Sequence, residues 1–75
     1  MKRMDKSYFG LRLHLVLDKH NMSQKEFADL VNVTEMTASK WVNGQSQPRI
    51  DYLVVICRRL GVSADWLLGL KEKRR

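Results

Sequence analysis

Residues 35–42, EMTASKWV, combine an apolar side with a row of polar and charged side chains suited to recognising another molecule. In a helix, each residue turns the chain by about 100°, so Ala38, Trp41 and Val42 share the inward side. The outward positions are then Met36, Lys40 and Asn43, flanked by Thr37 and Ser39. A short helix that is anchored on one face and polar on the other suits the major groove of DNA.

The sequence offers little to other kinds of chemistry. It contains no cluster of acid, base, nucleophile or metal ligands, so an enzyme is the poorest candidate and no cofactor or metal is expected. The single Cys57 cannot form an internal disulfide, which fits a reducing cytoplasm. His14 and His20 lie too far apart for a metal pair one helical turn apart, and we expect both at the surface.

A short helix and a tight corner are predicted to come directly before the helix over residues 35–42. Ser23 and Glu26 have the spacing of a capping box, which predicts a helix start before the apolar stripe 27–31. Asn32 follows, and asparagine tolerates the left-handed conformation that a corner requires. Thr34 is a suitable N-cap for the next helix.

The segment from Ser7 to His20 has two possible interpretations. Its leucines alternate with other residues from Leu11 to Leu17, which is the period of a strand. However, other apolar positions form one helical face, leucine favours helices, and no hairpin partner follows, so we predict a helix. That choice leaves a second apolar stripe on another face: Tyr8, Leu11 and Leu15.

Two further helices complete the predicted fold. One runs over residues 50–60 and stops at Gly61, and a short one, capped by Ser63, covers residues 64–69. We therefore predict an all-α, compact five-helix domain over residues 7–70. Residues 1–6 form a flexible N-terminus in this prediction, and residues 71–75 form a basic tail.

Composition and charge narrow the classes of partner. A chain of 75 residues makes one domain, and its 44% hydrophobic residues argue against disorder. The net charge of +6 favours polyanions, meaning nucleic acid or an anionic membrane surface. No predicted helix combines a basic face with a broad apolar one, so a membrane is not an expected partner. Arg12 and His14 interrupt the first apolar stretch, so a signal peptide is not expected, and no run approaches transmembrane length. A cytoplasmic protein is the expectation.

The order and spacing of these motifs resemble the phage-repressor and Cro type of helix-turn-helix domain, also called the XRE or lambda-repressor-like family. The resemblance runs from Phe9 to Leu70. The residues that carry it are Gln24, Ala28, Asn32, Trp41-Val42-Asn43-Gly44, Pro48, Leu53, Ile56, Leu60-Gly61-Val62-Ser63 and Asp65-Trp66-Leu67-Leu68-Gly69.

The resemblance implies a bacterial or phage-encoded, nucleoid-associated protein. It would be a sequence-specific transcriptional regulator, most like a phage or prophage repressor, that binds an inverted-repeat DNA operator as a dimer with helix 35–42 in the major groove. The residues it implies at base edges are Thr34, Glu35, Met36 and Lys40. Those it implies at phosphates are Gln24, Thr37, Asn43 and Arg49. Dimer contacts are expected around the last two helices, at Tyr52, Val55, Trp66 and Leu70.

This chain departs from the family pattern at two positions. Many members have an arginine where this chain has Leu17, and a glutamate where it has Val42. Because packed hydrophobic residues can replace a buried ion pair without loss of stability, we expect Leu17 and Val42 to touch.

A second class of function stays open, that of a protein-interaction module such as the antitoxin of a toxin–antitoxin pair. The stripe Tyr8, Leu11 and Leu15 motivates it, because exposed apolar patches often mark protein partners. Burial of that stripe in the monomer would weaken this alternative.

Overall fold

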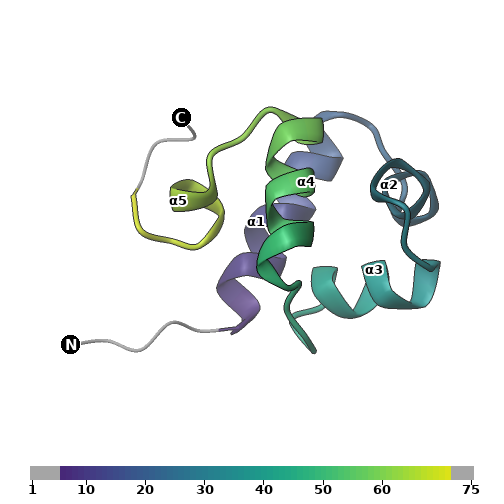
Figure 1. The fold of residues 1–75 in the computed structure, drawn as a ribbon, viewed down its shortest axis with the longest axis horizontal. Coiled ribbons are helices and arrows are strands. Elements are labelled where there is room, and N and C mark those ends of the chain that lie inside the picture. The colour runs from purple at the N-terminus through teal and green to yellow at the C-terminus, as the bar shows by residue number, and fades with distance from the viewer. Residues whose placement is uncertain (1–5, 72–75) are drawn as a thin grey trace.

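The computed structural model describes residues 6–71, which form five α-helices and no strand. The helices are α1 (Lys6–Lys19), α2 (Gln24–Val31), α3 (Glu35–Val42), α4 (Ile50–Leu60) and α5 (Ala64–Leu67). In Figure 1, α1 and α4 cross the centre, α2 and α3 lie to one side, and α5 lies to the other. The predicted five-helix fold is confirmed. Most of the predicted loose ends, residues 1–5 and 72–75, lies outside the described residues.

The helical interpretation of the first segment is correct. Phe9, Leu13 and Val16 lie on one face of α1 and are 1% exposed or less. The helix ends at Lys19, and the turn that follows contains Asn21, whose φ of 54° lies in the left-handed region that asparagine tolerates. The alternation of leucines is therefore incidental, because period-3.6 burial against the other helices decides the backbone of this segment.

Gly10 allows α1 to approach α3 closely. A Cβ atom at this position would lie 2.6 Å from the carbonyl oxygen of Val42 and 2.9 Å from that of Trp41. Both obstacles are backbone atoms, so any larger residue would force the helices apart. The absence of a side chain at Gly10 thus brings the C-terminal end of α3 against the middle of α1.

One core joins all five helices. Trp41 packs edge-on to Phe27 of α2, with ring centroids 6.4 Å apart. Leu17 and Val42 are both buried in this core, where the family pattern has an ion pair. The buried apolar residues are Phe9, Leu13, Val16, Leu17, Phe27, Ala28, Val31, Ala38, Trp41, Val42, Ile56, Leu60, Val62, Trp66 and Leu67.

Arg12 ties α1 to the C-terminal end of the described chain. Its guanidinium donates to the carbonyl oxygen of Trp66 at 2.7 Å and to that of Lys71 at 3.0 Å. It also donates to the Tyr8 hydroxyl and lies over the rings of Tyr8 and Trp66, 4.5 and 4.8 Å from their centroids. The sequence interpretation treated Arg12 only as a polar interruption. Its position three residues after Phe9, on the buried face, is the signal that it missed.

Candidate nucleic-acid interface

The outward face of α3 has the composition that the sequence predicted. Ala38, Trp41 and Val42 are buried, whereas Met36 is 70% exposed and Lys40 is exposed. Thr37 and Ser39 are half-buried on the two flanks. Because its apolar side is held by α1 and α2, α3 presents its polar side to the surroundings as a fixed ridge.

The corner before α3 is built by local hydrogen bonds. Asn32 adopts φ 64° and ψ 50°, and the amide of Val33 donates to the carbonyl of Ala28 at 2.9 Å. The Thr34 hydroxyl accepts from the Thr37 amide at 3.1 Å and donates to the Thr37 hydroxyl at 3.0 Å. The predicted turn and N-cap are both confirmed, and they hold the first turn of α3 at an exposed corner.

A hollow on one flank of α3 brings the start of α2 to the outward face. The predicted capping box is present: Glu26 accepts from the Ser23 amide at 2.8 Å, and the Ser23 hydroxyl accepts from the Glu26 amide at 3.0 Å. This cap holds Gln24 in the first turn of α2. The hollow is lined by Gln24, Glu35, Met36, Ser39, Lys40 and Gln45. Four of the residues predicted to contact DNA therefore share one surface.

A second hollow lies on the opposite flank of α3, where α4 begins. It is lined by Asn32, Val33, Thr34, Thr37, Trp41 and Tyr52. Thr34 and Thr37 of the predicted DNA contacts belong here. Tyr52 comes from α4 and is held by Trp41, with ring centroids 5.8 Å apart.

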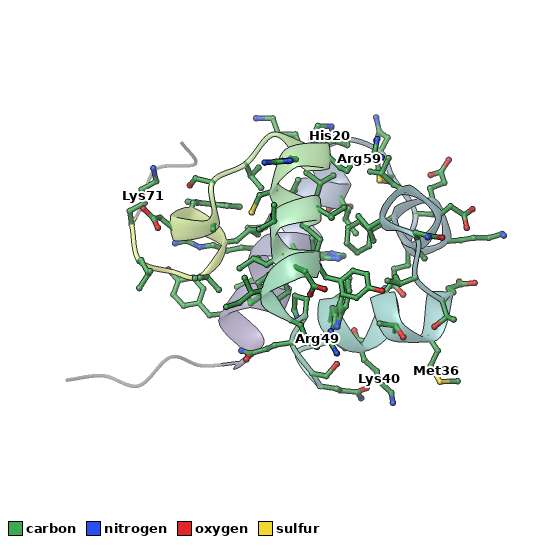
Figure 2. All side chains as sticks on the ribbon, in the orientation of Figure 1. His20, Met36, Lys40, Arg49, Arg59 and Lys71 are labelled. Atoms are coloured by element: carbon green, nitrogen blue, oxygen red, sulfur yellow. The ribbon has the colours of Figure 1, made fainter. Side chains whose placement is uncertain are left out.

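The other two predicted phosphate contacts lie at the ends of neighbouring elements. Asn43 caps α3 and is exposed, and its side-chain amide donates to the Ser39 hydroxyl at 3.2 Å. Arg49 precedes α4, is exposed, and lies 3.8 Å from the carboxylate of Asp51. Figure 2 shows Met36, Lys40 and Arg49 along the lower edge of the molecule, and His20 and Arg59 at the opposite edge.

The four residues predicted at a dimer interface differ widely in exposure. Trp66 is 6% exposed and belongs to the core, and Tyr52 packs beside α3. Val55 is half-buried, and Leu70, which follows α5, is 72% exposed. Within the core, the ring of Trp66 lies against the guanidinium of Arg12.

The second apolar stripe on α1 is mostly open to solvent. Leu11 and Leu15 are 59% and 46% exposed, whereas Tyr8 is half-buried against Arg12. Leu11 lines a shallow depression with His14, Val42 and Asn43, next to the end of α3. Two of the three residues that suggested a protein partner are therefore exposed apolar side chains.

Reactive groups are sparse in the part of the chain that the structure describes. No group of three or more metal-ligating side chains occurs within it. Cys57 is half-buried on α4, and burial raises the pKa of its thiol. No helix among residues 6–71 is long and apolar enough to cross a membrane.

Two curated relatives cover nearly all of this chain. One, an uncharacterized HTH-type transcriptional regulator of Haemophilus influenzae, is 34% identical over 73 residues, which is 97% of this chain and 30% of that protein. The other, the 26 kDa repressor protein of Escherichia phage HK022, is 33% identical over 76 residues, which is 96% of this chain and 32% of that protein. The chain thus spans about a third of the length of these relatives.

Solved structures share the fold. The P22 c2 repressor, crystallised with a synthetic operator, superposes with a TM-score of 0.79 at 24% identity, covering 84% of this chain and 96% of that one. The clp gene regulator ClgR of Corynebacterium glutamicum gives a TM-score of 0.77 at 19% identity, covering 91% and 88%. The helix-turn-helix family matches residues 13–67. This chain therefore belongs to the helix-turn-helix family.

Proposed function

We propose that this domain binds double-stranded DNA sequence-specifically, with α3 in the major groove. In this proposal it is the DNA-binding domain of a transcriptional repressor of the phage type. The observation that carries the proposal is the fixed ridge of α3. Its apolar side is buried, and its outward side joins Lys40, Met36 and Glu35 to the start of α2 in one hollow. The major groove is about 12 Å wide and admits such a helix.

The exposed side chains of this ridge suggest distinct roles at base edges. Lys40 can donate to the O6 and N7 atoms of guanine, Glu35 can accept from the N4 amino group of cytosine, and Met36 can touch a thymine methyl group. Thr34, at the exposed start of α3, is the fourth proposed base contact.

Phosphate contacts would set the register of the domain on the duplex. Gln24 and Thr37 lie on opposite flanks of α3, and Asn43 and Arg49 follow its end. The amides at the start of α2 add a partial positive charge beside Gln24. Arg49 is the cation of this set, and its loose pairing with Asp51 leaves it able to turn towards a phosphate.

A two-fold dimer on an inverted repeat is the proposed binding state. One domain reads few bases, and two recognition helices about 34 Å apart would double the contacts. In the monomer Leu70 is the most exposed of the residues predicted for this interface. Val55 contributes less surface, and the dimer is expected to be weak away from DNA.

Selection of binding sites from random duplex DNA tests the proposal. The purified protein, at about 0.15 M salt, is expected to enrich an inverted repeat with half-sites about one helical turn apart. Lys40→Gln is expected to change the selected bases. Arg49→Gln is expected to weaken binding to all sequences and to lower the salt slope by about 1.

Arg59→Gln supplies the matched control. It removes the same charge from the opposite edge of the molecule, so selection and salt slope are expected to change little. Recovery of no motif, with only weak salt-sensitive binding, would contradict sequence-specific recognition.

The exposed pair Leu11 and Leu15 supports one alternative, a protein-interaction module such as an antitoxin. Replacing both by serine removes apolar surface that is already exposed, so DNA selection is expected to stay intact under the leading proposal. If the double variant still binds DNA but loses its function in cells, that result would favour a protein-interaction module.

A further inference from the structure

The two hollows beside α3 suggest how the domain meets both walls of a DNA groove. Thr37 and Trp41 lie on one flank of the helix, and Ser39 lies on the other. An α-helix with its side chains is about 10–12 Å across, close to the width of the major groove. A helix that fills the groove must therefore bring each flank against one sugar–phosphate strand. The flank that faces α2 has Gln24 for this purpose, and the flank that faces α4 has Tyr52.

We propose that Tyr52 is a phosphate-contacting residue, and that its hydroxyl donates to the DNA strand on the α4 side of α3. The inference rests on the proposed DNA-binding function and adds a residue that the sequence interpretation assigned to dimerisation. Tyr52 lines the hollow together with Thr34 and Thr37. Tyr52 is therefore placed to contact the sugar–phosphate strand on that side of the groove.

The chemistry of this flank suits a phosphate oxygen. Among the described residues, the Tyr52 hydroxyl has no hydrogen-bond partner, so its proton is available. The Thr37 hydroxyl accepts the proton of Thr34, which leaves its own proton available to a second acceptor. Two neutral donors on one flank can bind one phosphate strand without adding a charge.

Packing holds the phenol ring in position before DNA arrives. The ring of Tyr52 is tilted by 55° against that of Trp41 at a centroid distance of 5.8 Å, and Trp41 is itself buried. Asp51 puts a negative charge near this flank, but its carboxylate accepts from the Tyr52 amide at 3.0 Å and lies 3.8 Å from Arg49. A preorganised donor loses little conformational entropy on binding.

Tyr52→Phe tests the inference, because it removes only the hydroxyl. On the duplex recovered by site selection, the variant is expected to bind about tenfold more weakly, the order expected for one hydrogen bond to a charged acceptor. The salt slope is expected to stay the same because a neutral donor releases no counterion, whereas Arg49→Gln lowers it. Urea unfolding of the variant is expected to match the wild type.

Neutralising single phosphates identifies the contact. Each phosphate of the duplex is replaced in turn by methylphosphonate, and one replacement on the α4 side is expected to weaken the wild type but not Tyr52→Phe. If wild type and Tyr52→Phe bind the duplex with equal affinity, the role of Tyr52 is refuted and the DNA-binding proposal is not affected. The phosphate contact of Tyr52 is also refuted if the two proteins differ in affinity but every methylphosphonate weakens both of them equally. A wild type that binds no duplex would instead remove the DNA-binding proposal, and this inference with it.

Discussion

Arg12 is expected to be among the most costly residues to replace, although it lies far from the recognition surface. The residue is 8% exposed, and its guanidinium donates to two backbone carbonyls, those of Trp66 and Lys71. The rings of Tyr8 and Trp66 also lie against the guanidinium, with centroids 4.5 and 4.8 Å away. Arg12→Met keeps the length and the apolar part of the side chain but leaves the carbonyls without this donor.

The magnitude follows from these contacts. Each hydrogen bond from a charged donor stabilises by about 1.5–3 kcal/mol, and each cation–π contact by about 0.5–2 kcal/mol. Desolvation of the guanidinium offsets several kcal/mol of this gain. We expect a net loss of about 2–4 kcal/mol in the free energy of unfolding, which is a large part of the roughly 5–10 kcal/mol of a small domain.

Urea titration measures this loss. With a slope of about 1 kcal/mol per M, typical of small domains, the midpoint is expected to fall by about 2 M or more. Tryptophan fluorescence reports on the two buried rings, Trp66 beside Arg12 and Trp41 of α3, and far-UV circular dichroism reports on the helices as a whole. Lys19→Met, which removes an exposed cation from the same helix, serves as the control and is expected to change stability by about 0.5 kcal/mol or less.

The reasoning is refuted if Arg12→Met is as stable as the wild type. That result would mean that the desolvation cost of the guanidinium cancels its hydrogen bonds and ring contacts, as some buried ion pairs do. Arg12→Lys separates charge from geometry. An ammonium lacks the planar fork that reaches two carbonyls at once, so we expect an intermediate loss.

Gly10→Ala is expected to lower the free energy of unfolding by at least about 2 kcal/mol, because its Cβ would meet two carbonyl oxygens of α3; calorimetry measures the fall in Tm. Asn32→Gly is expected to be nearly neutral and Asn32→Ala to cost about 1 kcal/mol, because φ is 64°; equal effects in urea titration would argue against a left-handed requirement. Leu17→Arg and Val42→Glu are each expected to cost about 3 kcal/mol, and the double variant less than their sum; additive losses would show that the two positions do not touch.

Much of the helix-turn-helix was predictable because its signals are local. The capping box of Ser23 and Glu26 acts across three residues, as does the cap that Thr34 gives Thr37. The left-handed turn at Asn32 depends on the residue itself. For these reasons the bounds of α2 and α3, and the outward face of α3, followed from the amino-acid sequence alone.

The remaining features depend on residues distant in the chain. The partners of Arg12 are carbonyls 54 and 59 residues away, and their backbone oxygens have no signature in the sequence. Tyr52 lies beside Trp41 of α3 because α4 packs against α2, which precedes α3 in the chain. Periodicity places a residue on a face of its own helix but does not say which neighbour that face meets. The sequence therefore determined the recognition motif, whereas packing between helices decided which side chains flank it and which support it from within.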